Sequence, residues 1–88
     1  MNATPTQSAI VESAQAARCD LTTIIVQMES VDGFATPVSI AASLEEMELL
    51  CADHCRSLNP DEDICPAKYV GFARDSYGKF QAVAEIEI

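Results

Sequence analysis

The sequence predicts a single α+β domain in which one long helix packs on one face of a four-stranded, mainly antiparallel sheet. Eighty-eight residues, 49% of them hydrophobic, suit one compact domain, residues 1–88, with a modest core. Four short segments alternate apolar and polar residues as strands do, and one longer segment repeats apolar residues at helical spacing. A further helix at the N-terminus completes the order helix, hairpin, helix, hairpin (αββαββ).

The N-terminal segment, residues 1–20, predicts a helix near residues 5–18. Thr4 can cap the first free amides, Pro5 suits the first helical position, and Gln7 can reach back to the cap. The apolar residues that follow are mostly alanines and form a narrow stripe. We therefore expect this helix to add little to the core, which lies in residues 21–88.

The first hairpin is predicted from residues 21–30 and 34–40, joined by a turn at Asp32-Gly33. Both segments are rich in β-branched residues and alternate in polarity. Pro37 cannot donate a hydrogen bond to a neighbouring strand, so the second strand should lie at a sheet edge. A helix beginning at Pro37 is the alternative interpretation.

The long helix is predicted over residues 44–58. Ser43 and Glu46 form a capping box, and apolar residues at helical spacing follow at once, which favours a start here over one at Pro37. Asn59-Pro60 ends the helix, and residues 61–66 make a polar connection.

The second hairpin joins a strand at residues 68–74 to a final strand at 80–88 through a turn at Ser76-Tyr77-Gly78. The final strand alternates cleanly. One face carries Phe80, Ala82, Ala84, Ile86 and Ile88, and the other carries Gln81, Val83, Glu85 and Glu87.

The charge of the chain restricts its partners. Fourteen acidic residues against five Lys and Arg give a net charge of -9, which disfavours direct binding to nucleic acid or to an anionic membrane. The N-terminus has neither a basic flank nor an apolar signal region, and no apolar run approaches the roughly 20 residues that span a bilayer. We expect a cytoplasmic protein that binds a basic protein surface.

Residues 45–63 hold seven of the fourteen carboxylates against one base, Arg56. On the predicted helix these acids form two rows along the exposed side, and Leu49 projects between them without a folding reason. A solvated helix face is the alternative interpretation of the acids. We predict a partner-binding surface made of Glu45, Glu46, Glu48, Leu49, Asp53, Asp61, Glu62 and Asp63.

Rows of carboxylates can imitate the phosphates of nucleic acid, so the expected partner is a nuclease or another nucleic-acid-binding complex. In size, acidity and lack of catalytic residues the chain resembles the small inhibitors that phages and mobile elements use against bacterial nucleases, including anti-CRISPR and anti-restriction proteins. No sequence motif defines these inhibitors, so the resemblance assigns no residues.

Catalysis is not expected, because the chain has no C-x-x-C motif and no phosphate-binding loop. Asn59, Asp61 and Asp63 match the first ligands of a calcium loop, but Ile64 and Val70 stand where glycine and glutamate are needed. No cofactor is expected.

Two other kinds of module remain open. Cys51, His54, Cys55 and Cys65 have the ligand types of a zinc site, although their spacing matches no standard zinc module. With Cys19 the cysteines could instead be free or paired, in any of three ways if the protein were secreted. The edge marked by Pro37 and the strand that ends at Ile88 could also add a strand from a partner or from a second copy.

Overall fold

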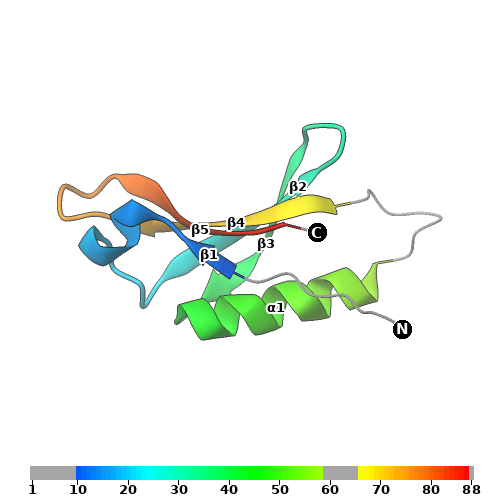
Figure 1. Ribbon diagram of the computed structural model, residues 1–88, viewed down its shortest axis with the longest axis horizontal. Coiled ribbons are helices and arrows are strands. Elements are labelled where there is room, and N and C mark those ends of the chain that lie inside the picture. Colours follow the sequence, from blue (N-terminus) through cyan, green and yellow to red (C-terminus); the bar gives the residue numbers. More distant parts are fainter. Residues whose placement is uncertain (1–9, 59–65, 88) are drawn as a thin grey trace.

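The protein is an α+β domain built on one antiparallel sheet, as predicted (Figure 1). The computed structural model describes residues 10–58 and 66–87. The sheet order is β1-β5-β4-β2-β3, and α1 lies along one side of it. The elements in chain order are β1 (Ile10–Glu12), the 3₁₀ helix η1 (Ala14–Arg18), β2 (Ile24–Ser30), β3 (Ala35–Ala41), α1 (Leu44–Ser57), β4 (Pro66–Arg74) and β5 (Phe80–Glu87).

The N-terminal segment differs from the predicted helix near residues 5–18. The sheet has five strands and not four, and residues 10–18 form a short strand and a 3₁₀ helix in place of the end of a long α-helix. Ile10 lies opposite Ile86 of β5, and Ser13 extends the contact by donating from its amide to Val83 O at 2.8 Å. Pairing with an open strand edge satisfies these backbone groups and suits the β-branched pair Ile10-Val11. The predicted helix start at Thr4 and Pro5 lies outside the described residues.

The first hairpin agrees with the prediction at its turn and at its edge. Gly33 has a φ of 90°, which glycine tolerates without cost, and the Ser30 amide donates to Phe34 O at 2.8 Å to close the loop. β3 is one of the two outermost strands of the sheet, and β1 is the other. Because hydrogen-bonded pairs alternate along a hairpin, Pro37 takes a position whose missing amide faces the free edge and not β2.

α1 begins where the capping box predicts. The Glu46 amide donates to Ser43 Oγ at 3.0 Å, and the Ala42 amide donates to Glu46 Oε1 at 2.7 Å. The alternative helix from Pro37 is wrong, because Pro37 belongs to β3. The helix ends at Ser57 with Leu58 as its C-cap, one residue earlier than predicted.

The core lies between α1 and the sheet. Met47 and Cys51 of α1 are buried against Ile24 and Tyr69, which come from β2 and β4. Gly71 allows this close approach, because a Cβ there would lie 2.6 Å from Met47 Sδ. A smaller contribution comes from η1, whose Ala16 joins the same core.

Two β-bulges interrupt the alternation of β3 and overturn the predicted faces of β5. Val38 and Val83 are each an extra residue against the neighbouring strand, so the alternation of inward and outward residues changes at these points. Val83, Ala84 and Ile86 are therefore buried together. Phe80, predicted to share a face with Ala84 and Ile86, lies opposite Arg74 on the side away from α1 and is 48% exposed.

Candidate interaction surface on helix α1

The exposed side of α1 brings together four of the eight predicted binding residues. Glu45, Glu48, Leu49 and Asp53 are all exposed. Leu49 is 67% exposed and lies about 160° around the helix from the buried Met47. It is therefore an apolar side chain that the fold leaves exposed to water. We call Leu49 together with the carboxylates of Glu45, Glu48 and Asp53 the α1 surface.

Two of the predicted binding residues are also used within the helix. Glu46 is exposed, but its carboxylate accepts a hydrogen bond from the Ala42 amide and so stabilises the start of the helix. Asp53 accepts a hydrogen bond from Arg56 Nη2 at 3.1 Å in an exposed ion pair. Exposed pairs of this kind add at most about 1 kcal/mol and are readily exchanged for a partner's charges.

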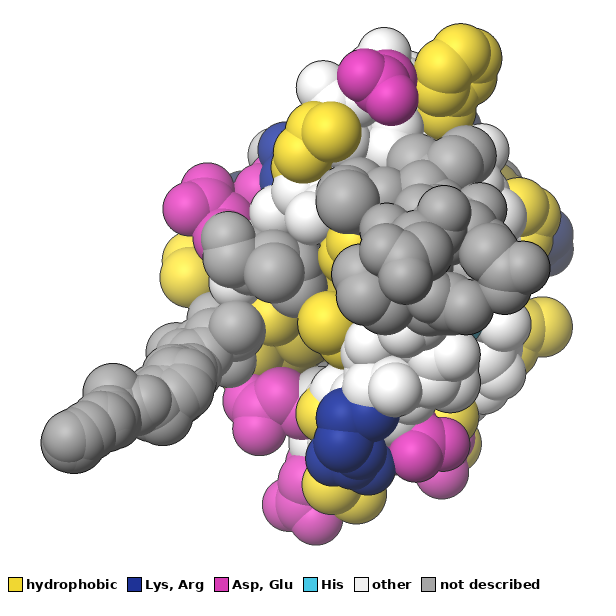
Figure 2. Space-filling model, turned by 90° about the vertical axis from the view of Figure 1, so that its right-hand side faces the viewer, with side chains coloured by type: hydrophobic (Ala, Val, Ile, Leu, Met, Phe, Trp, Pro, Cys, Tyr) yellow, Lys and Arg dark blue, Asp and Glu magenta, His cyan; other side chains and the backbone are white. Residues whose placement is uncertain are grey.

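The surface view agrees with this distribution of charge. On the face drawn in Figure 2, acidic side chains lie on either side of a basic patch along the lower rim, where α1 lies, and apolar groups lie beside them. The remaining predicted binding residues, Asp61, Glu62 and Asp63, lie outside the described residues. The α1 surface therefore comprises only predicted binding residues that lie on α1.

The proposed zinc ligands take a different arrangement. Cys51 is buried, Cys55 is half-buried, and His54 Nδ1 lies 2.8 Å from the Tyr69 hydroxyl, to which it is hydrogen-bonded. Across residues 10–58 and 66–87 no three His, Cys, Asp or Glu side chains converge as a metal site would require. The fourth predicted ligand, Cys65, lies outside the described residues.

The buried thiol is protected and not activated. Burial, with a smaller contribution from Cys55, raises the pKa of Cys51 to about 12. Burial likewise raises the pKa of Tyr69, which is completely enclosed. A nucleophilic cysteine needs a lowered pKa, so Cys51 is not suited to thiol chemistry. Cys19, Cys51 and Cys55 carry free thiols.

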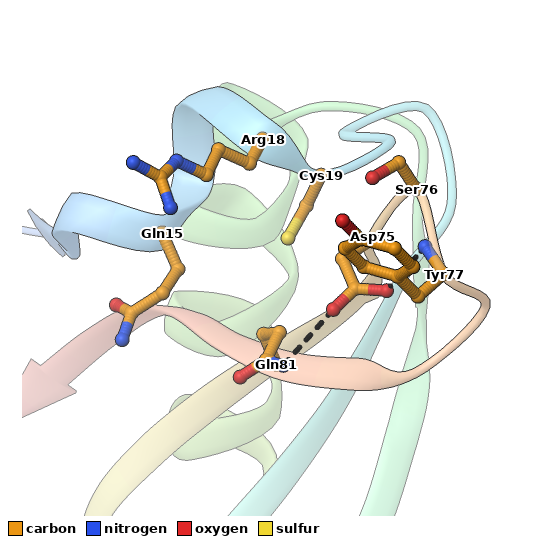
Figure 3. Close-up of a pocket in the computed structure, with 7 residues that line it drawn as sticks. All are labelled: Gln15, Arg18, Cys19, Asp75, Ser76, Tyr77 and Gln81. Carbon is orange, nitrogen blue, oxygen red and sulfur yellow. Dashed lines mark hydrogen bonds between the residues drawn. The ribbon is translucent and has the colours of Figure 1, made fainter.

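A small hollow of about 300 Å³ lies between η1 and the turn that joins β4 to β5 (Figure 3). Arg18 and Cys19 border it from one side, and Asp75, Tyr77 and Gln81 border it from the other. The sequence does not indicate this hollow, because its two walls are far apart in the chain. The antiparallel β-bridge between Cys19 and Asp75 and the hydrogen bond from the Asp20 amide to Arg74 O at 2.9 Å bring them together.

Asp75 organises its turn and is fully used there. Its carboxylate accepts hydrogen bonds from Gln81 Nε2 at 3.0 Å, from the Lys79 amide at 3.0 Å and from the Tyr77 amide at 2.8 Å. The Gln81 bond first, and then the backbone amides, lower the pKa of Asp75. The local sequence Asp75-Ser76-Tyr77-Gly78 is typical of such a turn.

Replacing Asp75 with asparagine should reduce the loss of stability in acid. Since the pKa of Asp75 is lower in the folded than in the unfolded chain, its stabilisation is complete above the unfolded value of about 4 and is lost as the pH falls through the folded value. Melting temperatures of the wild type and of Asp75→Asn, measured from pH 6 to pH 2, should converge as the pH falls. Parallel curves would contradict this assignment.

Comparisons with protein-family models, with curated protein sequences and with solved structures find no match for this chain. No helix in the described ranges is long and apolar enough to cross a membrane. Function is therefore inferred from the residues and their arrangement.

Proposed function

We propose that this protein acts without catalysis and binds a basic surface of another protein through the α1 surface. The expected partner is a nuclease or another nucleic-acid-handling complex. In this role the protein would act as an inhibitor, as anti-CRISPR and anti-restriction proteins of phages and mobile elements do, by occupying a channel that otherwise holds nucleic acid.

The observation that carries the proposal is the position of Leu49. It lies at the centre of the exposed side of α1, 67% exposed, with Glu45, Glu48 and Asp53 around it. A leucine in this position gains nothing from folding, but an apolar contact at the centre of a charged rim suits a protein interface. Carboxylates around it select a partner that presents Lys or Arg.

The charge of the whole chain supports the same kind of partner. At a net charge of -9 the protein attracts basic surfaces over a distance of several ångströms and repels nucleic acid itself. Nucleic-acid-binding channels are the basic surfaces that such a charge matches best. Binding of this type weakens as salt rises.

A pair of charge reversals tests the proposal. Glu45→Lys with Glu48→Lys changes the α1 surface, and Glu12→Lys with Glu87→Lys makes the same change in net charge on exposed strand ends. We expect the first variant to lose affinity for the partner at least about tenfold, and the second to lose much less, because reversal of interface charges opposes both steering and contact. Glu46 is left unchanged since it caps the helix.

The measurement is a pull-down from bacterial lysate at low salt, followed by affinity titration of the recovered protein with each variant. Recovery of a nucleic-acid-binding protein that added DNA displaces, and that only the α1 variant fails to bind, would support the proposal. Equal binding by both variants would exclude the α1 surface. Helical circular dichroism of both variants establishes that α1 remains folded.

Strand addition has less support from the fold. The sequence predicts that β5 is free to add a strand. In the structure it is not a free edge, because β1 pairs with it at Ala84, Glu85 and Ile86. The free edge of β3 contains Pro37, which offers no amide to an added strand. A homodimeric adaptor formed by strand addition at β3 or at β5 therefore remains a weaker alternative than binding through α1.

A further inference from the structure

The face of the sheet away from α1, here called the outer face, carries a continuous apolar row across four strands. Neighbouring members of the row lie directly opposite one another in the strand register, in the order Ile40, Ile25, Phe72 and Ala82. Within the described residues no helix packs against this row (Figure 1). Ile40 is 61% exposed as a result. The other three members are half-buried. An apolar row of this length that no helix covers indicates an interface.

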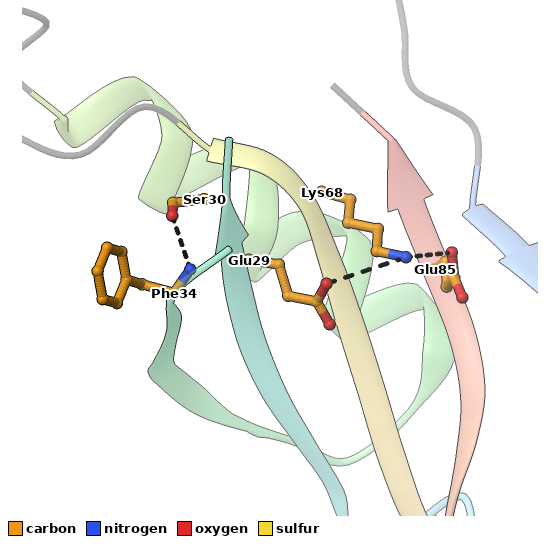
Figure 4. A network of polar contacts seen from close by, with 5 residues as sticks. All are labelled: Glu29, Ser30, Phe34, Lys68 and Glu85. Atoms are coloured by element: carbon orange, nitrogen blue, oxygen red, sulfur yellow. Dashed lines mark hydrogen bonds and ion pairs between the residues drawn. The ribbon is translucent and has the colours of Figure 1, made fainter. Parts of the chain in front are cut away.

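The two ends of the outer face differ in charge. At one end Arg74 lies over the ring of Phe80, with its guanidinium carbon 5.0 Å from the ring centre. At the other end Lys68 Nζ lies 3.4 Å from Glu85 Oε1 and 4.0 Å from Glu29 Oε1 (Figure 4). Two carboxylates around one ammonium leave this end acidic, while the Arg74 end is basic.

We propose that the outer face binds a second copy of the chain, with the two-fold axis parallel to the apolar row. This rotation lays one row on the other and reverses the strand direction. The basic end of each copy, at Arg74, then faces the acidic end of the other, near Glu85. A two-fold axis along the strands would instead bring the acidic end of each copy, with Glu29 and Glu85, onto the acidic end of the other, which like charges oppose.

A second copy fits this face better than an acidic or a basic partner does, because the face itself carries both charges and an apolar centre. The contact is small. Strands about 4.8 Å apart, with a rise of about 3.3 Å per residue, give a face on the order of 500 Å² per copy. Interfaces of that size are typical of weak complexes, so we expect dissociation constants of tens to hundreds of micromolar, on the order of 100 µM.

Sedimentation equilibrium of the full chain tests the dimer, from about 10 µM to about 1 mM in about 0.15 M salt, which screens the net charge of -9. A reductant excludes disulfide-linked pairs. The expected average mass rises with concentration from 9.5 kDa toward twice that value. A constant monomer mass over the whole range would overturn the proposal.

Three variants locate the interface. Ile40→Lys and Arg74→Glu should each raise the dissociation constant at least about tenfold, since the first puts a charge in the apolar row and the second places like charges opposite Glu85. Leu49→Lys, on the opposite side of the molecule, should leave it unchanged. A dimer that only Leu49→Lys weakens, or that tolerates Ile40→Lys, would place the interface elsewhere. Sensitivity to Ile40→Lys without sensitivity to Arg74→Glu would overturn the proposed orientation.

The dimer and the proposed function are independent, because they use opposite sides of the domain. Leu49→Lys and the Glu45, Glu48 reversals test partner binding, whereas Ile40→Lys and Arg74→Glu test self-association. Loss of one with retention of the other therefore identifies which inference has failed.

Discussion

Replacing Gly71 with alanine should lower the free energy of unfolding by about 2 to 3 kcal/mol. The added Cβ would lie 2.6 Å from Met47 Sδ and 2.8 Å from Ile24 Cγ2, closer than real Cβ contacts come. Met47 and Ile24 are completely buried, so neither can move away freely. The expected sign is notable because alanine normally stabilises a strand relative to glycine, by about 0.5 to 1 kcal/mol.

Urea denaturation of Gly71→Ala, Met47→Ala and the double variant measures this contact. Met47→Ala alone should cost about 2 to 5 kcal/mol through the cavity it leaves. In the double variant the cost of the alanine at Gly71 should fall, because the sulfur that it meets is gone, and the two effects will not add. Additive costs, or a Gly71→Ala protein as stable as the wild type, would contradict the packing described between α1 and β4.

The features that sequence predicts well are those encoded by a few neighbouring residues. Ser43 and Glu46 place the start of α1 because each side chain bonds to backbone within four residues. The Asp32-Gly33 turn and the edge position of Pro37 follow from backbone geometry in the same way. Long-range packing hardly enters these predictions.

The features that sequence misses depend on the register of distant strands. Nothing local distinguishes Val38 and Val83 as bulges, yet these two extra residues transfer Ile40 and Phe80 to the outer face. β1 is only three residues long and is defined by its pairing with β5. The alanine-rich sequence that follows it therefore predicts a helix across the whole segment. Gly71 similarly looks like an ordinary strand glycine until Met47 is placed above it.

The candidate site likewise has features that local sequence predicts and features that depend on packing between distant segments. Helical periodicity alone places Glu45, Glu48 and Leu49 on one exposed side, which the structure reproduces. The contact between His54 and Tyr69 joins α1 to β4 and could not be read from either segment. Within the described residues, this hydrogen bond to Tyr69 is the contact that the structure gives the imidazole of His54.

The buried side chains of Cys51 and Tyr69 should make the protein sensitive to alkali. Burial raises the pKa of Cys51 from an ordinary value of 9.0 to about 12, and raises that of Tyr69 from 10.0. Above about pH 9 the unfolded chain releases a proton from Cys51 that the folded chain retains, so stability is complete below that pH and falls as the pH rises. The slope is about 1.4 kcal/mol per pH unit for each group. By about pH 11 the free energy of unfolding should be about 3 to 4 kcal/mol lower than at pH 8, a large part of what a small domain possesses.

Denaturation with urea at each pH from 8 to 11, in reductant, measures this loss, and two variants divide it. Cys51→Ala should flatten the profile between pH 9 and pH 10, where the tyrosine of the unfolded chain is still protonated. Tyr69→Phe should leave that interval steep and flatten the profile above pH 10. Both variants start from a lower stability, because Cys51→Ala leaves a small cavity and Tyr69→Phe removes the hydroxyl that is hydrogen-bonded to His54. The comparison therefore uses the slopes of the profiles and not their absolute values. Profiles parallel to that of the wild type would mean that neither group keeps its proton in the fold, and that α1 packs less closely on β4 than the His54–Tyr69 contact implies.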